Sequence, residues 1–391
     1  RNSTAVHSQL LSMRANAQGL LGKPAEALGS AKEAANLVCE NTDLYLMECI
    51  NAQMELRHFY EWAGDFNSGL DAAAFAYNLA DSAGSMISDP MRLAVVGSYG
   101  NALSYGARTA EAIPLLEENA ALALNLFGDG AYRYARALHD LATAHLYAGD
   151  LHIAYPMARR VFEIGGRAQP GNPTNAYWLY QIYRIALDLR MPDQASSAFN
   201  EFSDDLPETM SDYYVHAFKV ERLRARALSK PGDAGIRDEI HDMLENFRNL
   251  DSPLYPKAAL LAAEQAVEAN DTSAAKQYLN QYHASIEAIP RTDIGPARSM
   301  LINARYLALL GETEQAIEEA GRSLSALQGI GHTDSPFVAE VQAVLANLNC
   351  SLSDMEKGKA QLLASYRYWT EIAKVPAGSK AMDRLAPACT R

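Results

Sequence analysis

The chain has 391 residues, of which 49% are hydrophobic and 21% are charged, and this composition excludes a disordered protein because enough apolar surface is available to form a core. The formal net charge of −13 argues against direct binding to nucleic acid or to an anionic membrane, since both need clustered basic residues and no basic run is longer than Arg159-Arg160. No apolar stretch approaches the roughly 20 residues of a membrane-spanning helix, so we expect no membrane insertion.

The chain begins at Arg1 rather than at a methionine, and we expect it to start inside a longer gene product or after processing. The four cysteines form no CxxC pair, and so few in so long a chain favour small core residues over a disulfide framework. A bridge within the first pair would require both residues to lie on adjacent antiparallel helices. The cysteines are Cys39, Cys49, Cys350 and Cys389.

Similar short segments recur along the whole chain, each with a turn residue, often glycine followed by aspartate, and a small residue five positions later. Examples are Leu21-Gly-Lys-Pro-Ala-Glu-Ala27, Trp62-Ala-Gly-Asp-Phe-Asn-Ser-Gly69, Tyr147-Ala-Gly-Asp-Leu-His-Ile-Ala154 and Leu310-Gly-Glu-Thr-Glu-Gln-Ala316. The small residues recur at intervals of 40 to 43 positions, although the sixth is placed partly by spacing: Ala27, Gly69, Ala112, Ala154, Ala195, Gly235, Ala275, Ala316 and Gly358.

Apolar residues on both sides of each turn follow helical spacing, and no segment alternates as a strand does. Glycine ends one helix, aspartate caps the next, and the small residue lets the two helices approach closely. We therefore predict about nine helical hairpins over residues 1–373, with turns near residues 22, 64, 107, 149, 190, 230, 270, 311 and 353, and a tail or capping segment over 374–391. Four turns carry a polar or charged residue at the turn position, and we expect those hairpins to be tilted: Arg190, Lys230, Asn270 and Ser353 stand there.

The repeat resembles the tetratricopeptide repeat (TPR) family, specifically its longer variant typified by kinesin light chain. The segment from Leu124 to Ala142 is similar to the link and following helix of that variant, and Tyr99-Gly-Asn-Ala-Leu-Ser-Tyr105 is similar to the first-helix core of many TPR units. The resemblance implies an all-α, right-handed α-solenoid of about nine antiparallel hairpins, whose first helices line a concave face. It says little about which ligand is bound.

A row of nine polar residues stands six positions before the turns, and in a chain that is half hydrophobic we expect this row to face water. One reading is a solvated wall. The other is a ladder that grips a peptide backbone, as asparagine does at this place in related domains, which makes Asn16, Asn101 and Asn347 the best candidates. The full row, called here the first-helix row, is Asn16, His58, Asn101, Thr143, Arg184, Arg224, Glu264, Arg305 and Asn347.

The later members of the row include three arginines, which suit a two-bond grip on a carboxylate. Arg184 shares a predicted helix face with Tyr177 and Tyr180, and His139 should lie at the matching level one repeat earlier. Arginine and tyrosine are enriched at interface hot spots, so this middle groove is predicted to hold an acidic or C-terminal peptide segment. The alternative is that both tyrosines pack between helices as core residues.

No motif of a nucleotide-binding, metal-dependent or serine-nucleophile enzyme is present, and we expect no cofactor, no metal and no catalysis.

We predict a protein- or peptide-binding scaffold or sensor that forms the regulatory part of a larger bacterial signalling protein. We expect it in the cytoplasm, with an extracytoplasmic or periplasmic location as the alternative. Other readings are a stand-alone peptide-pheromone receptor, a groove enzyme using His58 or His139 with Asp140, and a scaffold that oligomerises through Tyr366, Tyr368 and Trp369, for example as a homodimer.

Overall fold

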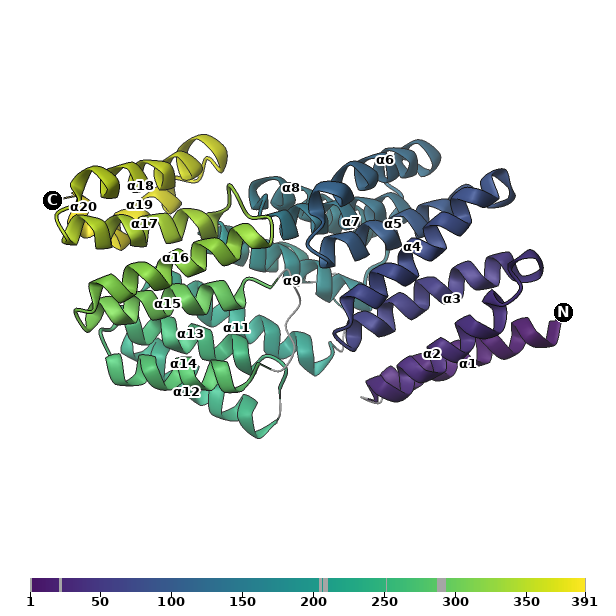
Figure 1. Ribbon diagram of the computed structural model, residues 1–391, viewed down its shortest axis with the longest axis horizontal. Coiled ribbons are helices and arrows are strands. Elements are labelled where there is room, and N and C mark those ends of the chain that lie inside the picture. Colours follow the sequence, from purple (N-terminus) through teal and green to yellow (C-terminus); the bar gives the residue numbers. More distant parts are fainter. Residues whose placement is uncertain are drawn as a thin grey trace. The chain divides into compact units, whose positions relative to one another are not determined.

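A computed structural model describes residues 2–20, 23–203, 206, 210–250, 252–286 and 293–390. Every long regular element in these ranges is a helix and none is a strand, which confirms the predicted all-α class (Figure 1). The helices form two compact units: unit 1 covers Arg1–Tyr147, and unit 2 covers Ala148–Glu287 and Asp293–Arg391. The turn predicted near residue 22 lies outside the described residues.

Unit 1 is a run of antiparallel helices, and from α1 to α6 each helix packs on the next one along the chain (Figure 1). A short 3₁₀ turn, η1 (Gly84–Met86), follows the second pair. The helices are α1 (Asn2–Leu20), α2 (Pro24–Cys39), α3 (Thr42–Trp62), α4 (Phe66–Ala83), α5 (Asp89–Tyr105), α6 (Thr109–Phe127) and α7 (Tyr132–Ala148).

Unit 2 shows the same pattern of successive pairs from α9 to α18. Two helices end in a π-helical turn, η2 (Phe162–Gly166) and η4 (Tyr368–Ile372). The α-helices are α8 (Leu151–Val161), α9 (Pro173–Asp188), α10 (Pro192–Phe202), α11 (Asp212–Ser229), α12 (Ala234–Asn249), α13 (Tyr255–Glu268), α14 (Thr272–Ala284), α15 (Gly295–Leu309), α16 (Thr313–Gly329), α17 (Pro336–Ser351), α18 (Met355–Arg367), α19 (Pro376–Leu385) and α20 (Pro387–Thr390).

The periodic small residues lie in the first turn of the second helix of a hairpin. Eight of the nine occupy the fourth position of the second helix and are buried. At Gly358 a Cβ atom would lie 2.9 Å from the Ala346 carbonyl oxygen, so glycine is required there. The sixth assignment was wrong: Gly235 is exposed, and the next residue, Ile236, is buried instead.

Most of the turns that the structure describes keep one backbone conformation whether or not glycine is present; the turn at Lys230 differs, because Lys230 has a φ of −137° and Gly232 takes a positive φ of 74° instead. Gly64, Gly149 and Gly311 adopt positive φ, and Arg190, Asn270 and Ser353 adopt φ of 59°, 58° and 68° at the corresponding place. This conformation costs a side-chain-bearing residue about 1 kcal/mol, which the packed helices on either side must offset. The loss of glycine therefore leaves these turns unchanged in form.

The C-terminal segment adds α19 and α20, which pack against α17 and α18. The resulting core includes Tyr368 and Trp369, and Gly378 lies against the Trp369 ring so closely that a Cβ atom has no room. Because both aromatic residues are buried within the chain, the prediction that they mediate self-association was wrong. Tyr366 is partly exposed, and its hydroxyl donates a hydrogen bond to Asp383.

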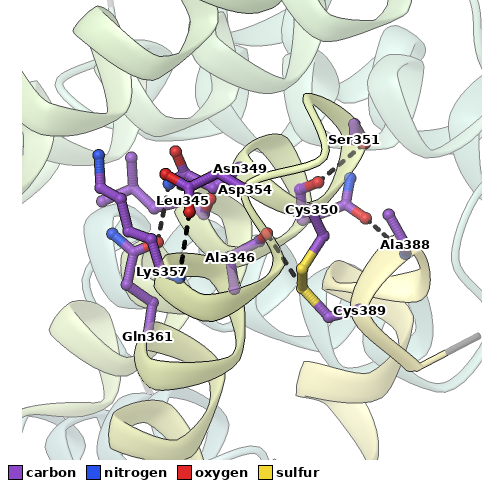
Figure 2. Close-up of a disulfide and its surroundings, with 11 residues drawn as sticks. Leu345, Ala346, Asn349, Cys350, Ser351, Asp354, Lys357, Gln361, Ala388 and Cys389 are labelled. Carbon is purple, nitrogen blue, oxygen red and sulfur yellow. Dashed lines mark hydrogen bonds between the residues drawn. A yellow bond between two sulfur atoms is a disulfide. The ribbon is translucent and has the colours of Figure 1, made fainter.

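All four cysteines are paired in disulfides, which corrects the prediction of small core residues. Cys39 at the end of α2 is bonded to Cys49 in α3, with Cα atoms 4.9 Å apart. Cys350 in α17 is bonded to Cys389 in α20, with Cα atoms 5.4 Å apart (Figure 2). Each bridge therefore ties together helices near one end of the chain.

In the described part of the chain, none of the helices has the length and apolar character needed to cross a bilayer.

Candidate functional site

The nine residues of the first-helix row each lie in the first helix of a hairpin, but they do not share one environment. Asn16 and His58 are exposed, and five others are partly buried. Thr143 and Arg224 are 4% and 8% exposed, so the expectation that the whole row faces water was wrong at these two positions.

In unit 1, neighbouring first helices are joined by polar side chains. Asn101 on α5 donates from Nδ2 to Oδ1 of Asp140 on α7 over 2.8 Å. The second carboxylate oxygen of Asp140 stands over Gly97, where a Cβ atom would lie only 2.7 Å away. Glycine on α5 therefore makes room for the Asp140 carboxylate.

Burial raises the pKa of Asp140, while the hydrogen bond from Asn101 and the charges of Arg136 and Arg57 oppose that effect. From the sequence, Asp140 was considered only as a partner of His58 or His139 in a groove enzyme. The structure instead pairs Asp140 with Asn101.

Two histidines of unit 1 are neutral at physiological pH. Burial, followed by the charges of Arg57 and Arg136, lowers the pKa of His58 to about 3, and burial with the charge of Arg136 lowers that of His139 to about 4. The His58 side chain is nevertheless partly accessible to solvent, and the charges of the two adjacent guanidinium groups lower its pKa in the same direction as burial does. A neutral imidazole can donate one hydrogen bond and accept another.

The guanidinium groups that act on these histidines have different surroundings. Arg57 is buried and paired with Glu61 on the same helix, with Nη1 2.8 Å from Oε1. Arg136 is exposed, and no hydrogen bond or ion pair joins it to the residues that the structure describes. We call His58, Asn101, Arg136, His139 and Asp140 the unit 1 polar strip. It combines polar donors and acceptors with the exposed cation of Arg136, whose charge also acts on the Asp140 carboxyl.

In unit 2, the first-helix row residue on α11, Arg224, forms ion pairs with carboxylates of the chain itself. Arg224 Nη2 lies 2.5 Å from Oδ1 of Asp188 on α9, and Nη1 lies 3.5 Å from Glu221. Burial alone would raise the pKa of Asp188, but the charges of Arg224, Arg298 and Arg184 hold it below its ordinary value. Arg224 is therefore committed to a buried ion pair.

The predicted aromatic groove beside Arg184 is only partly open. Tyr180 is 6% exposed, packs against Tyr214 and Phe218, and accepts a hydrogen bond of 2.7 Å from Lys257 Nζ. It is a packing residue, because the neighbouring helix α11 covers its ring. Tyr177 and Arg184 are partly exposed, and the Tyr177 hydroxyl accepts a hydrogen bond of 2.7 Å from Gln181.

The remaining members of the row also contact the chain itself. Arg305 Nη2 lies 2.7 Å from Glu268, and Glu264 lies 3.1 Å from Arg298. Asn347 accepts a hydrogen bond of 2.9 Å from the backbone of Ala388, and so it holds α20. Asn16 donates only to the carbonyl of Ser12 in its own helix. The structure thus links Asn101 to α7, the helix of His139, through Asp140, and does not bring all nine positions together.

Most of the charged partners were not predicted from the sequence, although the sequence contains a signal for them. Partners on neighbouring first helices are 34, 36, 36 and 37 positions apart, slightly less than one repeat. Opposite charges at that interval therefore indicate contact across a repeat boundary. The pairs are Glu264–Arg298, Asp188–Arg224, Glu221–Lys257 and Glu268–Arg305.

No group of histidine, cysteine, aspartate or glutamate side chains suited to a metal ion occurs within the described ranges.

No protein-family model matches this sequence, and no curated protein matches it. Among solved structures, a tetratricopeptide repeat protein from Parabacteroides merdae is similar to it: the match covers 81% of this chain and 98% of that chain, at 12% sequence identity and a TM-score of 0.46. So distant a likeness carries no argument about function. The TPR-like description of this chain depends on its own helix pairs.

Proposed function

We propose that this chain is a protein-interaction module that holds a polypeptide segment on the unit 1 polar strip. The observation that carries the proposal is the Asn101–Asp140 hydrogen bond, with Gly97 beneath it, which positions polar side chains of α5 and α7 at a fixed separation. Fixed, partly exposed donors and acceptors suit an extended peptide backbone, which offers both N–H and C=O groups.

The preferred segment carries an acidic group. Arg136 is exposed and has no carboxylate partner in the part of the chain described, whereas His58 and His139 are neutral. An arginine fork binds a carboxylate through two parallel hydrogen bonds. An acidic side chain or a free C-terminus of the bound segment would supply that group.

The arginines of unit 2 support this assignment to unit 1. Arg224 and Arg305 are already paired with Asp188 and Glu268 of the chain itself. Binding an external carboxylate at Arg224 would require its buried pair with Asp188 to break, and breaking a buried pair is costly. The peptide site is therefore assigned to the unit 1 strip, where Arg136 has no hydrogen-bonded carboxylate among the described residues.

We further propose that the module works in an oxidising compartment rather than in the cytoplasm. All four cysteines are consumed in two disulfides, and such bonds persist where thiols are not kept reduced. Within this proposal the module serves as the regulatory or sensing part of a bacterial signalling system. Thiol trapping on the protein in its native cells tests the compartment, and two free pairs of thiols would contradict it.

The binding proposal is tested with a displayed library of short random peptides, selected on the intact oxidised chain. We expect enrichment of acidic peptides whose binding is lost in Arg136→Glu and weakened in Asn101→Ala. Lys32→Glu is the matched control, because it reverses one exposed charge on α2, outside the strip. Failure to enrich any peptide, or equal binding by Arg136→Glu and Lys32→Glu, would overturn the proposal.

A further inference from the structure

Unit 2 contains a small pocket of about 50 Å³ beneath the C-terminal helix α19. Its walls come from the turn after α9 and from α13, α15 and α17, and α19 closes one side. The pocket shares no residue with the unit 1 polar strip, so its ligand is independent of the proposed function.

Charged side chains of both signs line this pocket. Four are arginines and three are glutamates: Arg190, Arg298, Arg305, Arg384, Glu264, Glu268 and Glu340. If all seven are ionised, the lining carries one net positive charge. A singly charged anion would neutralise it, whereas a doubly charged phosphate would face three carboxylates with only one excess cation.

Three of the arginines are paired, but each pair leaves donors unused. Arg298 and Arg305 each contact their glutamate through Nη2 alone, at 3.1 and 2.7 Å. Arg190 contacts a single oxygen of Glu340, with its Nε at 2.8 Å. A guanidinium has five N–H donors, so further hydrogen bonds into the pocket are available without breaking these pairs.

The fourth arginine is different. Arg384 lies in the last turn of α19, lines the pocket and is exposed. Among the residues that the structure describes, no carboxylate or other hydrogen-bonding group is paired with it. Arg384 therefore supplies an unneutralised cation at the side of the pocket that reaches solvent.

The size of the pocket limits what can enter. A cavity needs a volume of roughly 10–15 Å³ to hold one water molecule, so a pocket of about 50 Å³ accommodates a few waters or one compact group. The apolar part of the lining, which includes Ile302 and Val344, is buried and offers no hydrogen bonds. A carboxylate with one attached carbon fits both the volume and the charge.

We propose that this pocket binds a carboxylate group, with Arg384 as its principal ligand and the unused donors of Arg190, Arg298 and Arg305 around it. The carboxylate could come from a small organic acid or from the C-terminus of a polypeptide. Both sources present the same chemistry to the pocket, and the experiment separates them.

The test uses the intact oxidised chain at constant ionic strength. Acetate, a short alanine peptide with a free C-terminus and the same peptide as its C-terminal amide are titrated, with acetamide as a neutral isostere of acetate. Saturable binding of acetate assigns a small acid, and binding of the free peptide alone assigns a chain terminus. We expect Arg384→Gln to weaken either one about tenfold, as expected for the loss of a hydrogen bond to a charged group.

Arg226→Gln is the matched control, since it removes an exposed arginine that does not line the pocket. Ala381→Leu provides a second test, because it fills the pocket from α19 without changing the charge. Circular dichroism shows whether each variant is folded. Equal binding by wild type and Arg384→Gln, equal binding of acetate and acetamide, or no saturable binding of any probe would overturn the proposal.

Discussion

Arg190 donates a hydrogen bond of 2.8 Å to Glu340, although 150 positions separate the two residues. Arg190 lies in the turn between α9 and α10, and Glu340 lies in α17, so unit 2 brings its first complete hairpin against its last. Met191 packs against the C-terminal core in the same way. In an ordinary solenoid each repeat contacts only its neighbours, and here long-range contacts couple non-neighbouring repeats.

This coupling predicts that Arg190→Ala destabilises unit 2 by about 2–3 kcal/mol, because Glu340 is then left as a largely buried, unpaired carboxylate. The double variant Arg190→Met with Glu340→Leu should recover most of that loss, since neither charge remains. Urea unfolding followed by the fluorescence of the buried Trp178 and Trp369 measures both. A double variant no more stable than Arg190→Ala would contradict the argument.

The two disulfides should contribute unequally to stability. The Cys350–Cys389 bridge spans 39 positions and the Cys39–Cys49 bridge only 10. In the chain-entropy description these loops correspond to about 4 and about 3 kcal/mol. Unfolding the Cys350→Ser/Cys389→Ser and Cys39→Ser/Cys49→Ser variants in denaturant measures the two effects, and a larger loss from the shorter loop would contradict the prediction.

Two helical glycines should respond to alanine in opposite directions. Gly358→Ala places a methyl group against Cys350 and the Ala346 carbonyl oxygen, and we expect a loss of about 1–3 kcal/mol. Gly29→Ala meets nothing within 4 Å on the exposed side of α2, and we expect a gain of about 0.5–1 kcal/mol from reduced backbone entropy. Thermal unfolding of both variants checks the difference in sign.

The sequence alone was sufficient to predict the features of the fold that depend on local steric fit. The small residue after each turn, as at Ala154 and Ala316, follows from the closeness of two helices in one hairpin, and this pattern recurs at every repeat except the sixth. Turn conformation was less predictable, because Arg190 and Ser353 adopt a backbone that favours glycine. Tertiary packing determined those two turns.

The character of the candidate sites depended on partners from other helices. Arg224 looks like a ligand-binding arginine in the sequence, and only the position of Asp188 makes it a buried structural cation. Tyr180 is covered by the next helix for the same reason. The interval of slightly less than one repeat between opposite charges is a usable signal for such pairs, whereas nothing local indicates the pairing of Arg190 with Glu340.

His139 should make unit 1 less stable as the pH falls. Its pKa is lowered from the ordinary 6.5 to about 4, chiefly by burial, so the unfolded chain binds a proton that the native state does not. The stabilising contribution is complete above pH 6.5 and is lost progressively down to about pH 4, with a slope approaching about 1.4 kcal/mol per pH unit. His139→Gln should flatten the pH dependence of the free energy of unfolding over that interval. An unchanged slope in His139→Gln would mean that burial does not keep this imidazole neutral.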